Sequence, residues 1–94
     1  MQRFKETLIK IIRQHLPNCK IYLFGSRARG THKEGADVDI ALDNGAPIDF
    51  SVMLATTGDI EESDLHLFVD VVDVHRVDKD FLDMIKKEWI EWIV

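Results

Sequence analysis

The chain has 94 residues, 46% of them hydrophobic and 31% charged, with a net charge of −5. This length predicts one domain over residues 1–94, which buries a modest share of its surface and is therefore compatible with a homo- or hetero-oligomer. The acidic balance argues against holding duplex nucleic acid by basic charge, and the lack of an apolar run of about 18 residues excludes an ordinary membrane span.

The first half of the chain predicts a helix followed by two strands. Apolar residues at helical spacing predict a helix over residues 2–16, and the charged residues between them exclude an ordinary secretory signal. A run of β-forming residues over 19–24 predicts a strand, and residues 27–33 are expected to form a short helix or loop. Alternating acidic and apolar residues predict a second strand over 37–42.

The cysteine content indicates a reducing compartment. Cys19 is the only cysteine of the chain, so it cannot form an internal disulfide. Because it opens an apolar run, we expect it to pack in the core rather than to take part in catalysis. A lone thiol is typical of a cytoplasmic protein, which is the location we expect.

The second half of the chain predicts a helix, a strand and a last helix. Residues 48–64 have helical spacing that a Thr-Thr-Gly segment weakens, and the nearly continuous β-branched run at 67–74 predicts a central strand. Asp78 or Asp80 is expected to cap a helix that continues to the end of the chain. The apolar face of this helix would comprise Phe81, Ile85, Trp89 and Trp92. This order predicts an α/β fold with a short mixed sheet of three or four strands flanked by helices.

Two acids on the second predicted strand suggest a metal site. Asp37 and Asp39 are two residues apart, so their carboxylates leave the same face with Cα atoms about 6.5 to 7 Å apart. Two such charges repel by about 3 kcal/mol at an effective dielectric near 20 unless solvent or a cation compensates them. Carboxylate oxygens suit Mg²⁺, which usually takes one or two of them together with substrate phosphates. The alternative is an exposed edge strand with a polar face.

The turn after the first strand suggests a phosphate site. Gly25 and Ser26 lie between a predicted strand and a short helix, where backbone N–H groups favour an anion. Arg27 and Arg29 follow at once, and either could contact phosphate oxygens bidentately. The alternative is a serine-capped helix with solvated arginines. The pairing of this turn with Asp37, after ten intervening residues, is a stronger signal than either motif alone.

A site with two metal ions requires a third carboxylate. The predicted strand over 67–74 offers Asp70 and Asp73, which must point to opposite faces because their positions differ by an odd number. Only one of the two can join Asp37 and Asp39, and periodicity does not choose between them.

Three segments of the chain resemble a known family. They are I-Y-L-F-G-S-R-A-R-G, then G-A-D-V-D-I-A-L, then F-V-D-V-V-D-V followed by F-L-D-M-I-K-K-E-W. They are similar to those of the nucleotidyltransferase superfamily that includes DNA polymerase β and the aminoglycoside nucleotidyltransferases. The chain looks most like the minimal nucleotidyltransferases that act as antitoxins beside HEPN toxins, and the resemblance spans nearly all of it.

The resemblance implies a small nucleotidyltransferase fold and assigns roles to the motif residues. The catalytic and metal-binding acids are implied to be Asp37, Asp39 and Asp70. The nucleotide-binding residues are implied to be Gly25, Ser26, Arg27 and Arg29. One departure is Ala36, where the family often has serine. A second is the lack of an appended substrate-binding domain, so acceptor recognition is expected to come from a partner or from the acceptor itself.

The implied reaction is the transfer of AMP from ATP to a hydroxyl, with two Mg²⁺ ions assisting in-line attack on the α-phosphorus. We expect the acceptor to be a tyrosine of a cognate HEPN toxin and the chain to act as its antitoxin. One alternative is a non-catalytic antitoxin that neutralises its partner by binding. Another is a stand-alone small-molecule enzyme of the aminoglycoside type, which the missing second domain disfavours.

Overall fold

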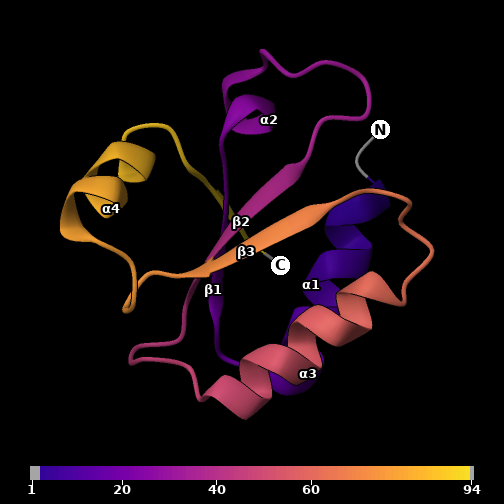
Figure 1. Cartoon of the computed structure of the whole chain (residues 1–94), viewed down its shortest axis with the longest axis vertical. Coiled ribbons are helices and arrows are strands. Elements are labelled where there is room, and N and C mark those ends of the chain that lie inside the picture. Colours follow the sequence, from indigo (N-terminus) through magenta and orange to yellow (C-terminus); the bar gives the residue numbers. More distant parts are fainter. Residues whose placement is uncertain (1–2, 94) are drawn as a thin grey trace.

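A computed structural model describes residues 3–93 and arranges them as a four-stranded sheet with helices on both faces (Figure 1). The elements in chain order are α1 (Arg3–His15), β1 (Lys20–Phe24), α2 (Ser26–Arg29), β2 (Val38–Asp43), α3 (Phe50–Glu61), β3 (Val69–Asp73), α4 (Lys79–Lys86) and β4 (Ile90–Trp92). The predicted α/β class with a short mixed sheet is confirmed. Residues 2 and 94, which the predicted first and last helices include, lie outside the described residues. Within residues 3–93, no helix has the length and apolarity to cross a membrane.

The strand order is β3-β2-β1-β4. β1 pairs antiparallel with both β2 and β4, whereas β2 and β3 are parallel and are joined through α3. The prediction of a central strand over 67–74 is therefore wrong, because β3 lies at an edge of the sheet. Val69 and Val71 pack toward one core cluster and Val72 toward the other. The β-branched run thus reflects two covered faces rather than two neighbouring strands.

The prediction of a last helix that reaches the end of the chain is also wrong. α4 is capped by Asp78, whose side chain accepts a hydrogen bond from Asp80 N–H, and it ends at Lys86. Trp89 then stacks on Tyr22 of β1, with ring centroids 3.8 Å apart, while Trp92 is 2% exposed in the cluster on the other face. One helix stripe could not send the two indoles to opposite faces of the sheet, whereas a strand can.

The two faces of the sheet have different coverings, as Figure 1 shows: α1 and α3 lie together on one face, and α4 lies on the other. The larger cluster joins Leu8 and Ile12 of α1 and Ile60 of α3 to the sheet, and it includes Cys19. Burial raises the pKa of the Cys19 thiol to about 11, as expected for a packed, unreactive side chain. The smaller cluster, built around Tyr22, Phe24, Ala41, Val74 and Ile85, lies under α4.

Candidate active site

The sheet register brings two of the predicted acids together. Asp39 of β2 lies opposite Asp70 of β3 and opposite Phe24 of β1. Paired residues on neighbouring strands point to the same face, with Cα atoms about 5 Å apart. Phe24 packs under α4, so Asp39 and Asp70 lie on the α4 face, at the end of the sheet where β1 runs into Gly25. Asp37 precedes β2 by one residue and is exposed.

The electrostatics of Asp39 show that the acids interact. Burial raises the pKa of the Asp39 carboxyl, and the neighbouring charges of Asp70, Asp37 and Glu88 raise it further, while Arg29 lowers it. Among residues 3–93, no donor hydrogen-bonds the carboxylates of Asp37, Asp39 or Asp70. The cluster therefore holds mutually repelling carboxylates whose lone pairs no group in the described part of the chain satisfies, which is the condition that a bound cation relieves.

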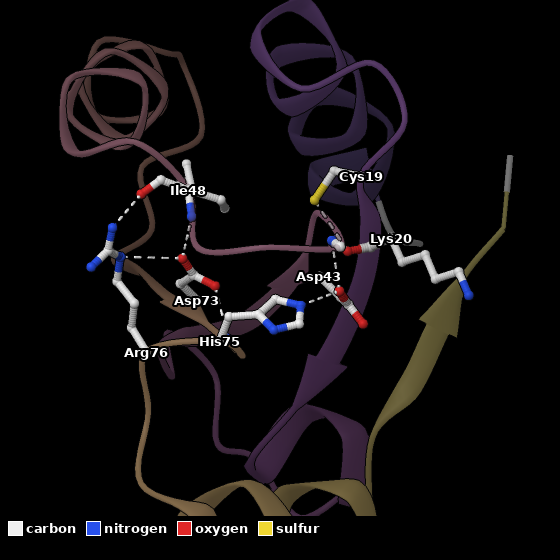
Figure 2. Close-up of polar contacts among 8 residues, drawn as sticks. Cys19, Lys20, Asp43, Ile48, Asp73, His75 and Arg76 are labelled. Atoms are coloured by element: carbon white, nitrogen blue, oxygen red, sulfur yellow. Dashed lines mark hydrogen bonds and ion pairs between the residues drawn. The ribbon is translucent and has the colours of Figure 1, made fainter.

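Asp73 is separated from this cluster by the pleat of β3. It pairs with Leu42 rather than Asp39, is 5% exposed and lies on the α1/α3 face (Figure 2). Its Oδ2 accepts a hydrogen bond from Ile48 N–H at 2.7 Å and its Oδ1 accepts one from His75 N–H at 2.9 Å. Asp73 thus fixes the segment before α3, and Asp70 is the acid of this strand that shares a face with Asp39.

The turn at Gly25 adjoins the acids. Gly25 has φ +78° and ψ −159°, a backbone conformation that side chains with a Cβ rarely adopt. A Cβ at this position would also collide with Oδ2 of Asp39. Gly25 therefore lets the backbone pass directly against the carboxylate. Ser26 begins α2, and Gly25 rather than Ser26 is the residue at its N-cap, so the alternative of a serine-capped helix does not describe this turn.

The two arginines of the motif have different surroundings. Arg27 donates from Nε and Nη2 to the carbonyl of Ala36 at 3.1 and 2.9 Å, and its guanidinium lies 5.2 Å from the ring centroid of Phe4. Phe4 packs against the α1/α3 cluster, so Arg27 braces the backbone before Asp37 from that side. Arg29, which is half exposed, instead reaches toward the acidic cluster.

One residue of this region, Glu88, was not predicted from the sequence. Glu88 follows α4, and its Oε2 accepts hydrogen bonds from Gly25 N–H at 2.9 Å and from Arg29 Nη1 at 2.6 Å. Its side chain is only 18% exposed. Nothing in the local pattern of K-K-E-W marks this glutamate, because its position depends on where α4 ends and on Trp89 stacking against β1.

The donor set decides which ion these residues could hold. Among residues 3–93, no three acidic, histidine or cysteine side chains form a ready-made cage for one metal ion. Mg²⁺ does not require such a cage, because it usually binds one or two carboxylates and completes its octahedron with phosphate oxygens and water. Oxygen-only ligands beside a turn whose donors can bind phosphate therefore fit Mg²⁺ better than zinc.

Comparisons with known proteins agree with this geometry. The family model described as polymerase beta, nucleotidyltransferase, matches residues 6–91. The probable protein adenylyltransferase MntA of Haemophilus influenzae is 32% identical over 80 residues, which cover 85% of this chain and 70% of that protein. A crystal structure of a toxin–antitoxin with AMP-PNP contains a chain that matches with a TM-score of 0.79 and 26% identity, over 96% of this chain and 73% of that one.

A further structure, of the tri-AMPylated Shewanella oneidensis HEPN toxin in complex with MNT antitoxin, matches with a TM-score of 0.75 and 25% identity, over 100% of this chain and 74% of that one. The family model covers most of the chain, and the relative shares nearly a third of the aligned residues. These matches confirm the resemblance seen in the motifs: the chain belongs to the polymerase beta nucleotidyltransferase family and is a nucleotidyltransferase homologous to MntA.

Proposed function

We propose that this protein transfers AMP from ATP to a tyrosine hydroxyl of a cognate HEPN toxin in the cytoplasm and so acts as an antitoxin, with Mg²⁺ as cofactor. The observation that carries the proposal is the pairing of Asp39 with Asp70 directly beside the Gly25 turn. The relatives supply the substrate class, since one is named a protein adenylyltransferase and another is an antitoxin bound to an AMPylated toxin.

The residues that would hold the cofactor are Asp37, Asp39 and Asp70. The repulsion among them and their unpartnered oxygens support a cation site, and their chemistry fits a hard ion. When bound, two Mg²⁺ ions would lower the pKa of the acceptor hydroxyl and neutralise the charge of the departing pyrophosphate.

The protein groups orient the reactants. Gly25 N–H, the Ser26 hydroxyl and Arg29 would bind triphosphate oxygens and align the α-phosphorus for in-line attack. Arg27 would act one step back, by holding the Ala36 carbonyl and hence the approach to Asp37. As the tyrosine oxygen bonds to the α-phosphorus, the bond to pyrophosphate breaks and Asp70 takes the tyrosine proton.

The openness of the cluster favours a macromolecular acceptor. Asp37 and Asp70 are both exposed, and β3 is an edge strand. A hydroxyl carried on another protein can therefore approach Asp70 from outside the sheet, without entering an enclosed pocket. A small-molecule enzyme of this family would require further surface to hold its acceptor, whereas an acceptor protein brings its own.

The test is mass spectrometry of the toxin after incubation with Mg²⁺-ATP and this protein. We expect the toxin to gain one or more adenylates with the wild type and with Asp64→Asn, an exposed acid outside the site that serves as control. Asp39→Asn should abolish the gain and the neutralisation while leaving binding of the toxin intact. Neutralisation that survives Asp39→Asn would support the binding-only antitoxin. Adenylation of small molecules with no change in the toxin would support the stand-alone small-molecule enzyme.

A further inference from the structure

We infer that the Glu88 carboxylate is an internal ligand of the triphosphate position, so that an incoming nucleotide must displace it before binding. This inference rests on the function proposed above and concerns the regulation of the same site. Glu88 Oε2 already accepts from Gly25 N–H at 2.9 Å and from Arg29 Nη1 at 2.6 Å. These are the backbone and side-chain donors that a phosphate oxygen would use there.

A single oxygen of Glu88 takes both donors, so the position cannot be shared. A phosphate oxygen that reached Gly25 N–H would have to occupy the place that Oε2 now fills. The burial of the pair points the same way. The Glu88 side chain is 18% exposed whereas Arg29 is 50% exposed, so the carboxylate, not the guanidinium, is the inner member of the ion pair.

The surroundings make this carboxylate a replaceable ligand. Glu88 stands beside Asp39, whose ionisation its charge opposes. It therefore lies among like charges, and within residues 3–93 its two hydrogen bonds are the only polar contacts that hold it. A triphosphate that arrives with cations would supply the same two donors with an acceptor and would neutralise the acids as well, which Glu88 cannot do.

Displacement requires a side-chain rotation and no refolding. Ile85, three residues before Glu88, is 1% exposed under the sheet, and Trp89, directly after it, is stacked on Tyr22. The backbone at Glu88 is thus anchored on both sides, while its side chain has a solvent-exposed edge. The apparent nucleotide affinity then equals the intrinsic affinity multiplied by the fraction of molecules in which Glu88 has left Gly25.

The experiment compares nucleotide affinity in matched variants by isothermal titration calorimetry. The probes are AMP-PNP with Mg²⁺ and inorganic triphosphate with Mg²⁺, the second because it reports the phosphate position without the base. Glu88→Gln should lower the Kd of both probes by about three- to tenfold, because a neutral amide is a weaker competitor than a charge-assisted acceptor. Glu88→Asp keeps the charge but is one methylene too short, and it should also tighten binding. Glu91→Gln, an exposed acid on β4, is the charge-matched control and should change nothing.

Several results would overturn the inference. Weaker binding in Glu88→Gln, with loss of AMP transfer, would make Glu88 a direct nucleotide or metal ligand. An equal gain in affinity in Glu91→Gln, or no gain in affinity in Glu88→Asp, would show that the effect comes from the overall charge of the protein. Thermal unfolding checks that each variant is folded, and Glu88→Asp carries the test if Glu88→Gln is not. Wild-type protein that binds a probe while the Glu88 variants bind it no better refutes this inference alone. Protein that binds neither probe in any variant and transfers no AMP refutes the proposed function as well.

Discussion

Replacing Asp39 by Asn should stabilise the metal-free protein while it abolishes AMP transfer. Asp39 faces the charge of Asp70 across a strand pair about 5 Å apart and also the charges of Asp37 and Glu88. Two unit charges at 5 to 6 Å repel by about 3 kcal/mol at an effective dielectric near 20. Partial exposure of the cluster and the opposing charge of Arg29 reduce this figure, so we expect a net gain of about 1 kcal/mol in the free energy of unfolding.

The assay is urea unfolding of both proteins in EDTA and again in excess Mg²⁺. Mg²⁺ should stabilise the wild type, since a ligand that binds only the folded state adds RT ln(1 + [L]/Kd), and it should stabilise Asp39→Asn much less. Since the pKa of Asp39 is raised in the folded state, its penalty is fully present above that pKa and disappears as the pH falls below the ordinary value of 3.8. The advantage of the variant should therefore shrink on acidification. A variant less stable than the wild type in EDTA at neutral pH would show that the carboxylates are not in conflict.

Three further predictions follow from the neighbouring contacts. Gly25→Ala should destabilise the protein by about 1 to 3 kcal/mol and abolish AMP transfer, because the new side chain strains a positive φ and pushes Asp39 aside. Urea unfolding measures the loss of stability and the toxin mass assay measures the loss of transfer. A variant that still transfers AMP would contradict the role of the turn. Asp73→Asn should cost about 1 to 3 kcal/mol in urea unfolding yet leave AMP transfer by the folded protein unchanged, whereas a folded but inactive variant would return Asp73 to the site. Hydrogen bonds from Gly45 N–H and His75 lower the pKa of Asp43, so its contribution to stability is present above the ordinary pKa of 3.8 and is lost as the pH falls through the folded value. The difference in unfolding free energy between wild type and Asp43→Asn should therefore be larger at pH 7 than at pH 3, and a constant difference would refute it.

The glycine turn and the first pair of acids could be predicted from the sequence, because each depends on residues that are close together in the chain. Gly25-Ser26 after a strand and Asp37-Val38-Asp39 at the start of the next are short patterns whose backbone geometry is set by neighbouring residues. β2 begins one residue later than predicted, at Val38, yet Asp37 still lies beside Asp39. The spacing thus predicted that the two acids are close together, although Asp37 lies just outside the strand expected to hold both.

The features that the sequence did not yield depend on contacts between distant segments. The choice of Asp70 over Asp73 is a matter of register between β2 and β3, and both acids fit the same strand pattern. The β4 strand forms because Trp92 finds a place beside Phe4, with ring centroids 6.1 Å apart, at the other end of the chain. Glu88 lies 63 residues after Gly25 and accepts its hydrogen bond only because α4 ends before Glu88.

The division between the two faces of the sheet explains how so short a chain keeps a strained site. The α1/α3 face holds the larger apolar cluster, and Asp73, the one acid of β3 on that side, is satisfied by hydrogen bonds. The α4 face has a smaller cluster that includes Phe24, and the repelling acids lie at the same register position, where Asp39 is opposite both Phe24 and Asp70. The core residues and the repelling acids therefore lie on the same two strands, β2 and β3. A substitution in the larger cluster should lower stability without altering the charges around Asp39. A neutralising substitution in the acidic cluster should alter those charges without lowering stability.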